Sequence, residues 1–292
     1  MVNFDYLEPK TVGEACRLLR KYNGAAKIFA GGAHLTILMK QGLFSPKVLI
    51  NIKRIPALTG IRFDPKKGLI IGALVTHREI ETSAIIREHL PVFAEVEREV
   101  ANIRVRNMGT VGGNLASGEP LTDLAQIFIA VDGQIRIAGP NGRRTLPVED
   151  LFVDFYQTRL AAEEILTEVL LPPVPPRSGI DYIRFSSSSV VDKPSVGVAV
   201  RMTLEPSRIL CQDARVVLGC VGPTPVRARK AEASLIGAAL TPQLLETVGA
   251  LATEECSPTA DLRGSEAYKR AIVGTLVRRA AAKAYDKALG AG

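Results

Sequence analysis

Two short stretches of the chain place paired glycines directly before a predicted helix: Ala30-Gly-Gly-Ala-His34 and Thr110-Val-Gly-Gly-Asn114. Paired glycines allow the backbone to turn with positive φ and to approach a ligand closely. Successive free N–H groups at a helix start then form a concave set of donors for an anion. One such loop can hold a phosphate, and two loops from neighbouring units can hold a pyrophosphate from both sides. Each loop alone is equally compatible with a simple tight turn.

The chain lacks the common motifs of other nucleotide sites and of catalytic sites. It has no GxGxxG after a strand, no GxxxxGK[ST], no GxSxG and no HExxH. The serine run 186–189 has no base nearby in the sequence. Widely spaced cysteines predict buried apolar residues rather than a metal or Fe–S site. These cysteines are Cys16, Cys211, Cys220 and Cys256. We therefore expect a bound cofactor, and no metal, to carry any chemistry.

The sequence around each glycine pair predicts a small unit of helices and strands. In residues 1–56, a capping box at Thr11 begins one helix, and the first glycine pair begins another over Ala33–Gln41. In residues 57–176, a capping box at Thr76 precedes helical segments, and alternating apolar residues predict strands. The segments expected in this second unit are Thr59–Phe63, Leu69–Leu74, Ile85–His89, Val92–Ile103, Leu121–Val131, Gln134–Val148 (a hairpin) and Glu164–Leu171.

A proline-rich segment, Pro172-Pro-Val-Pro-Pro176, marks the clearest boundary of the chain. Four prolines can continue neither a helix nor a central strand. Beyond them, strands followed by helices predict an α+β domain with a largely antiparallel sheet over residues 177–292. The segments expected there are Tyr182–Ser186, Ser195–Leu204, Ala214–Val221, Arg227–Gly237, Gln243–Glu254 and Ser265–Leu289.

Composition narrows the class of protein. The 292 residues suffice for two or three units, and 47% apolar with 23% charged residues is typical of a globular chain. The net charge of +7 is dispersed and only 5% of residues are aromatic, which argues against nucleic acid and favours an acidic partner or a phosphate-bearing ligand. The sequence shows neither a signal peptide nor a transmembrane segment, so we expect a cytoplasmic protein.

Several polar residues admit two interpretations. Asp123 lies near a predicted helix start, where it either complements the helix dipole or accepts hydrogen bonds from a cofactor hydroxyl. Asn114 is either a helix cap or a ligand contact. His34 could contact phosphate, tether a flavin covalently, or simply begin a helix. His77 and His89 have no evident partner and are expected at the surface.

In this order, the motifs resemble those of one family, the FAD-binding medium subunits of molybdenum hydroxylases of the carbon monoxide dehydrogenase and xanthine dehydrogenase type. The similar segments cover nearly the whole chain. They are Phe4–Pro9, Ala30–Lys40, Ile71–Thr76, Arg106–Leu115 with Asp123-Leu124, Pro223–Ala228 and Asp261–Arg270. The resemblance implies an α+β chain: two FAD-binding subdomains of the vanillyl-alcohol-oxidase (PCMH) kind, 1–56 and 57–176, then a CO dehydrogenase flavoprotein C-terminal-like domain, 177–292.

The resemblance also implies a site for non-covalent FAD between the two subdomains. By position, Asp123 would contact the ribityl or ring end, the backbone of Leu166 would lie near the isoalloxazine, and Arg184 stands where the family often has Lys. The serine run 186–189 replaces an aromatic residue that stacks on the flavin in some members. The residues expected around the pyrophosphate are Phe29, Ala30, Gly31, Gly32, Ala33, His34, Leu35, Thr110, Gly112, Gly113 and Asn114.

The function implied is that of an electron-carrying subunit. Its partners would be a molybdopterin-binding large subunit and a small 2Fe–2S subunit, in a dimer of heterotrimers. Two other functions stay open, a stand-alone FAD-dependent oxidase or reductase, and a non-catalytic nucleotide-binding or interaction module. The substrate would bind another chain, and NAD, a quinone, ferredoxin and oxygen are all possible acceptors.

Overall fold

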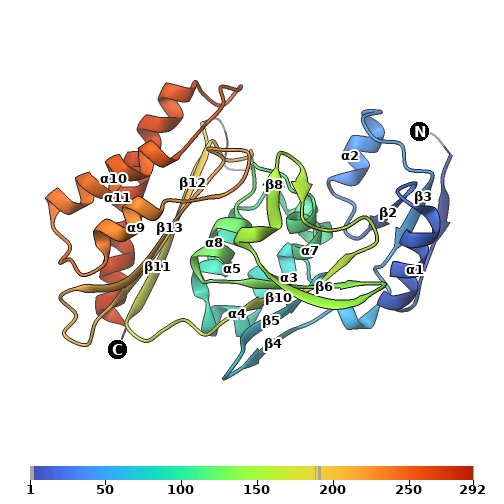
Figure 1. The fold of residues 1–292 in the computed structure, drawn as a ribbon, viewed down its shortest axis with the longest axis horizontal. Coiled ribbons are helices and arrows are strands. Elements are labelled where there is room, and N and C mark those ends of the chain that lie inside the picture. Colours follow the sequence, from blue (N-terminus) through green and yellow to red (C-terminus); the bar gives the residue numbers. More distant parts are fainter. Residues whose placement is uncertain (1–2, 188, 190–191, 292) are drawn as a thin grey trace.

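The protein is built of three parts in a row, with the N-terminal unit at one end and the C-terminal helices at the other (Figure 1). The computed structural model describes residues 3–187, 189 and 192–291. Three clusters of buried apolar side chains lie along this row. The predicted α+β class is confirmed, whereas the domain boundaries at residues 56 and 176 stay predictions.

The N-terminal part is a small parallel sheet in the order β1 (Asp5–Leu7), β3 (Val48–Asn51), β2 (Ala26–Phe29). Helix α1 (Val12–Tyr22) buries one apolar face against it, as its periodicity predicted. Helix α2 (Leu35–Lys40) is shorter than the predicted Ala33–Gln41 and has no fully buried residue, although four of its six residues are apolar.

The central part is an antiparallel sheet with helices along one side. The strands run in the order β4 (Ile61–Asp64), β5 (Gly68–Gly72), β10 (Ile165–Leu171), β6 (Gln134–Gly139), β7 (Gly142–Pro147). The helices are α3 (His77–Thr82), α4 (Ala84–His89), α5 (Pro91–Glu99), α6 (Ile103–Met108), α7 (Val111–Ala116) and α8 (Leu124–Ala130). Short elements complete this part: η1 (Pro56–Leu58), η2 (Glu149–Leu151), β8 (Phe152–Asp154) and β9 (Gln157–Thr158).

Two predicted helices of the central part were wrong in extent. The single helix predicted over Val92–Ile103 is interrupted after Glu99, because Ala101 takes φ +45° and the Asn102 side chain caps a new helix, α6. The helix predicted from Leu121 begins only at Leu124. The capping box at Thr76 and the hairpin β6–β7 are confirmed.

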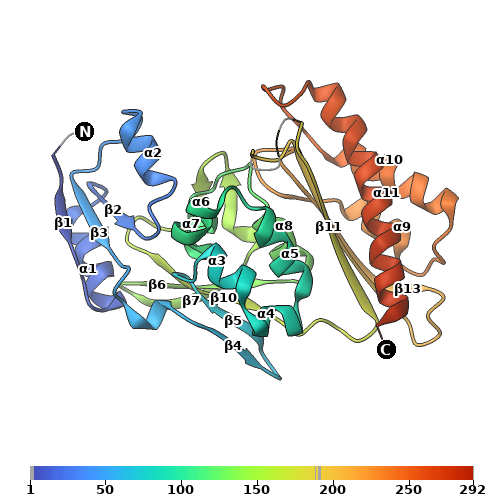
Figure 2. The same cartoon turned by 180° about the vertical axis from the view of Figure 1, so that it is seen from behind.

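The C-terminal part is an antiparallel sheet, β11 (Ser178–Phe185), β12 (Val196–Leu204), β13 (Cys211–Gly219) and β14 (Val226–Arg227). Helices α9 (Arg229–Leu235), α10 (Pro242–Glu255) and α11 (Glu266–Gly290) cover one face. Helix α8 of the central part packs on the other face (Figure 2). All residues of β12 are therefore buried, which explains the run of small and β-branched apolar residues in its first half, Val196–Val200.

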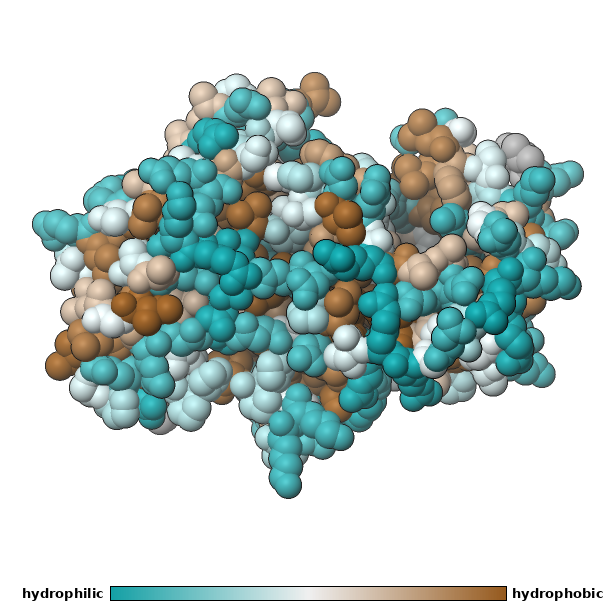
Figure 3. All heavy atoms as spheres, viewed as in Figure 1, coloured by the Kyte–Doolittle hydropathy of each residue, from teal (hydrophilic) through white to brown (hydrophobic). Residues whose placement is uncertain are grey.

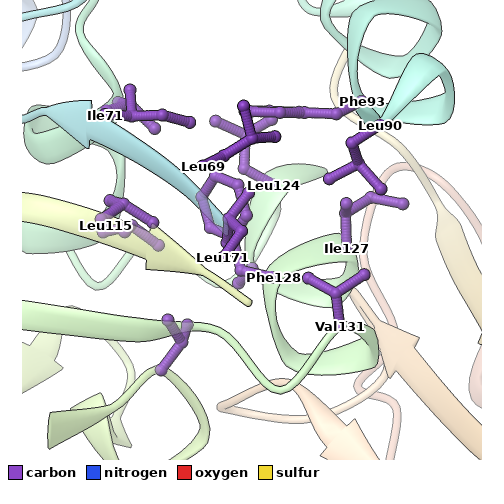
Figure 4. Close-up of a cluster of buried hydrophobic side chains, with 14 of the residues drawn as sticks. Leu69, Ile71, Leu90, Phe93, Leu115, Leu124, Ile127, Phe128, Val131 and Leu171 are labelled. Carbon is purple, nitrogen blue, oxygen red and sulfur yellow. The ribbon is translucent and has the colours of Figure 1, made fainter. Parts of the chain in front are cut away.

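Helix α8 joins the central and C-terminal parts through one continuous core. All seven of its residues are buried. Phe128 meets Phe93 of α5 edge to face, with 5.0 Å between ring centroids. Around this pair, aliphatic side chains of β5, β10 and α8 converge (Figure 4). Ala199 and Val217 of the C-terminal sheet belong to the same cluster, so the two parts share their packing.

Of the two histidines expected at the surface without partners, His77 is buried, and His89 is partly exposed but has a partner. His77 is 3% exposed, and its Nδ1 lies 2.8 Å from Oε2 of Glu97, which is completely buried. His89 stacks on Phe63 with 3.5 Å between ring centroids. These partners are distant in sequence, so the local pattern could not show them.

Truncation of the shared core should be costly. We expect Phe128→Ala to lower the free energy of unfolding by about 3–5 kcal/mol, because the ring is fully buried and leaves a cavity. Urea unfolding followed by circular dichroism measures this change. A loss below about 1 kcal/mol would mean that α8 is not packed as described.

Candidate functional site

The first glycine stretch lies against the backbone of Met108 and Gly109, the two residues directly before the second stretch. A Cβ on Gly31 would collide with the carbonyl oxygen of Met108 and lie 2.9 Å from Cα of Gly109. Gly32 takes φ +76°, which turns the chain into α2. Only a residue without a side chain permits this approach at position 31, so the sequence pattern has a steric cause.

The first glycine stretch carries a row of N–H groups that are available to a ligand. Within the described part of the chain, no backbone N–H from Ala30 to Leu35 donates to a protein acceptor. His34 occupies the N-cap of α2 without a capping hydrogen bond from its side chain. Such consecutive free N–H groups form the concave donor set that binds phosphate groups.

The second glycine stretch is arranged differently from the first. It forms the helix α7, and its first N–H groups are already used: Val111 donates to Val75 O, Gly112 to Ala73 O and Gly113 to Oγ1 of Thr110. A Cβ on Gly112 would lie 2.5 Å from that of Ala73. Among the four paired glycines only Gly32 has positive φ, so the expected conformational role was wrong for the others.

Asn114 supplies an acceptor that the protein leaves unused. Its Oδ1 is buried and has no hydrogen-bond partner among the described residues. A buried acceptor without a partner costs about 1–3 kcal/mol, so a ligand donor that satisfied it would bind more tightly. The free amides of the first stretch and this orphan oxygen fit a ligand with phosphates and hydroxyls, such as FAD.

Asp123 joins the central part to the C-terminal sheet. Its Oδ1 accepts a hydrogen bond from the Tyr182 hydroxyl at 2.6 Å and lies 3.3 Å from Nε of Arg184. Burial raises the pKa of Asp123, and the guanidinium of Arg184 opposes that rise. The side chain makes no cap to α8, although Asp123 is its N-cap residue. Helix capping is therefore not its role, and contact with a cofactor stays a prediction.

Leu166 directly precedes Thr167, which is linked to the second glycine stretch through Ala73. It is 4% exposed on β10, and the strand register shifts between Leu166 and Glu168. The bulged residue Thr167 accepts a hydrogen bond from the N–H of Ala73, whose own carbonyl holds Gly112. The bulge thus connects β10 to the start of α7.

A further polar group at this site was missed from the sequence. Glu119, after α7, lies 2.5 Å from Nζ of Lys193 and accepts a hydrogen bond from the Tyr156 hydroxyl. The Tyr156 ring lies 6.0 Å from that of His34. Burial lowers the pKa of His34, so its ring is neutral at pH 7. These side chains come from four separate segments, so no local motif could reveal them.

One face of the molecule carries a notch next to α2. Figure 3 shows the surface hollowed between the apolar lobe that carries α2 and the middle of the molecule. Two other hollows, of about 600 and 210 Å³, lie elsewhere and are lined by residues 175–178 and by residues 129–134 among others.

Other expectations concern cysteines, metals and membranes. All four cysteines are buried, as predicted. Across residues 3–187, 189 and 192–291, no three His, Cys, Asp or Glu side chains are placed to hold a metal ion. None of the helices in the same residues has the length and apolar character needed to cross a membrane. Of the serine run 186–189, Ser188 lies outside the described residues.

The site and the three-part fold together define a class of flavoprotein. A family model for the "FAD binding domain in molybdopterin dehydrogenase" matches residues 2–174. A second model, the "CO dehydrogenase flavoprotein C-terminal domain", matches residues 182–284. The chain belongs to the FAD-binding medium subunits of molybdenum hydroxylases, the flavoprotein subunits of multi-subunit oxidoreductases. The resemblance of the motifs is thereby confirmed.

Individual relatives match over nearly the full length. The chain is 36% identical to the carbon monoxide dehydrogenase medium chain of Hydrogenophaga pseudoflava, with 95% of each chain covered. It is 34% identical to the nicotine 6-hydroxylase medium subunit of Paenarthrobacter nicotinovorans, covering 94% of each. The solved carbon monoxide dehydrogenase of H. pseudoflava superposes with a TM-score of 0.94, at 36% identity, over 98% of this chain and 99% of that one.

The contact between the stretches can be tested at Gly31. We expect Gly31→Ala to separate the two stretches, since its Cβ meets rigid backbone, and to abolish FAD retention. Gly13→Ala is the matched control. Apart from its neighbours in the chain and the backbone of its own helix, the nearest atom to its Cβ would be a nitrogen of Arg17 at 3.7 Å. Flavin absorbance after desalting measures retention. Equal retention by both variants would contradict the close contact.

Proposed function

We propose that the chain binds one FAD non-covalently between residues 29–35 and 110–114 and carries electrons through it. The observation that carries the proposal is the row of unbonded N–H groups from Ala30 to Leu35. These donors suit the doubly charged pyrophosphate of a dinucleotide. Phe29, directly before them, has its ring against Gly32 and fixes the turn.

The residues of the site would divide the binding between them. The amides of the first stretch hold the pyrophosphate, and Asn114 Oδ1 accepts a hydrogen bond from a cofactor hydroxyl. Gly112 and Gly113 hold α7 in place rather than donating to the cofactor, since their N–H groups bond to Ala73 O and to Oγ1 of Thr110. The Thr110 hydroxyl, which accepts from Gly113, would use its proton to bind the cofactor.

The ring end of the cofactor would lie between the central and C-terminal parts. There Asp123 contacts the ribityl or ring end, and the backbone of Leu166 lies near the isoalloxazine. Arg184, held by Asp123, supplies a positive charge that favours a negatively charged form of the ring. FAD, when bound, supplies two-electron redox chemistry. The protein binds it, orients it and limits its contact with water.

The wider assembly is inferred from the relatives. Similar chains are named as medium chains or medium subunits of dehydrogenases and hydroxylases. We infer that a molybdopterin-binding large subunit oxidises the substrate and that a small 2Fe–2S subunit passes the electrons to this chain. With FAD bound, this chain would pass the electrons on to an external acceptor. A dimer of heterotrimers is the expected stoichiometry.

Reconstitution tests the proposal. The full chain, incubated with FAD and desalted, should keep its flavin absorbance, and acid precipitation should release all flavin into solution because no covalent bond holds it. A folded chain that loses all flavin on desalting would overturn the proposal. It would favour the alternative function of a non-catalytic nucleotide-binding or interaction module. Flavin that stays with the precipitate would show a covalent link.

A substrate-turnover assay distinguishes the proposed electron-transfer subunit from a stand-alone FAD-dependent oxidase or reductase. We expect the isolated, FAD-loaded chain to oxidise no organic substrate, because its described residues show no substrate-handling constellation at the site. Substrate-dependent bleaching of the flavin should appear only after the two partner subunits are added. Turnover by the isolated chain would favour a stand-alone oxidase or reductase instead.

A further inference from the structure

We infer that the buried pair His77–Glu97 is a positioning device for the flavin site, acting through Gly109 on Gly31. The inference rests on the proposed binding of FAD at the first glycine stretch. His77 and Glu97 lie behind this stretch, where neither can touch the cofactor. Their effect on affinity is therefore indirect and depends on the backbone between them and the amides.

Three layers in contact connect the pair to the cofactor amides. A Cβ on Gly109 would lie 2.8 Å from Cδ2 and 3.1 Å from Nε2 of His77, so the imidazole ring is in close contact with this glycine. The Cα of Gly109 is 2.9 Å from where a Gly31 Cβ would be. The backbone N–H of His77 also donates to the Gly109 carbonyl at 3.1 Å. Displacement of the ring would therefore move Gly109 and, with it, the support of Gly31.

The ring is held in place by a single strong contact. His77 Nδ1 lies 2.8 Å from Glu97 Oε2, and the two side chains are 4% and 0% exposed. Glu97 Oε1 is buried and has no hydrogen-bond partner among the described residues, so the carboxylate depends on His77. A charged pair in such a place is strongly weakened when one partner loses its charge.

The charges that act on the His77–Glu97 pair come from four elements. Glu97 lies on α5, Glu81 on α3, Arg106 on α6, and Asp123 at the start of α8. Burial alone would lower the pKa of His77, but the Glu97 carboxylate and its hydrogen bond raise it above the ordinary value. Because the folded pKa is raised, the pair stabilises the site at low pH. This contribution is lost as the pH rises through that raised value.

Two variants separate positioning from general stability. In His77→Asn, the amide can still donate to Glu97, but the ring no longer fills the space against Gly109. In Glu97→Gln, the shape is kept while the charge is removed. Arg201→Gln is the matched control: Arg201 is equally buried, and it pairs with Asp132 at 2.9 Å and Asp213 at 2.6 Å, on the sheet away from the glycine stretches.

The measurement is the dissociation constant of FAD for the full chain, by flavin fluorescence, from about pH 6 to about pH 9, where a histidine with a raised pKa titrates. Wild type should bind more weakly as the pH rises. His77→Asn should bind about tenfold more weakly at the acid end. Glu97→Gln should lose the pH dependence, and Arg201→Gln should keep the wild-type curve despite a lower melting temperature.

The outcomes distinguish the inference from the function on which it rests. A wild-type chain that binds no FAD overturns the proposed function itself. If wild type binds, affinity within about twofold of it for His77→Asn, or a retained pH dependence in Glu97→Gln, overturns the positioning role alone. Equal weakening by Arg201→Gln would reduce the effect to general stability and also overturn it. Should His77→Asn fail to fold, the Glu97→Gln curve decides.

Discussion

Close contact of glycine backbones holds the candidate site together. Gly31 rests on the Met108 carbonyl and on Gly109, and Gly112 rests on Ala73. None of these approaches tolerates a Cβ, so the N-terminal and central parts meet at a distance that only glycine permits. The free amides of the first stretch are arranged by this contact, and the second stretch serves as their support. The two similar motifs therefore differ in role: the N–H groups of the second stretch are bonded within the protein, and those of the first stretch are not.

The contact of Asp123 with Arg184 depends on burial from both sides of the C-terminal sheet. Helix α8 fills the space between this sheet and the central one, while α10 and α11 cover the outer face. Arg201 and Arg215 bridge Asp132 and Asp213 at the edge of the same interface. The position of Arg184 beside Asp123 is thus fixed by a packed core and not by a flexible loop.

Much of the fold was predictable because long periodic segments determine it. Strands β12 and β13 and helices α10 and α11 differ from their predicted bounds by a few residues. The proline-rich segment lies between β10, a strand of the central sheet, and β11, the first strand of the C-terminal sheet. The interruption between α5 and α6 was missed because it arises from a left-handed Ala101, which no turn motif announces.

The site was predictable only as a pair of motifs. The sequence located both glycine stretches, but the internal bonding of the second stretch depends on Ala73 and Val75, which are distant in the chain. The contacts of His77 with Glu97, and of Glu119 with Tyr156 and Lys193, join separate elements in the same way. Such tertiary pairs leave no signature in one sequence.

The shared core also determines which parts of the molecule open together and therefore how a bound ligand is released. Because α8 belongs to the packing of both larger parts, these parts should open together, whereas the N-terminal part has its own core, joined to the rest by Leu74, Ile165 and the α1–β6 contact. Local opening follows the boundary with the least shared burial. A ligand held between the first two parts would therefore leave by a small sub-global opening, and its residence time would report that motion.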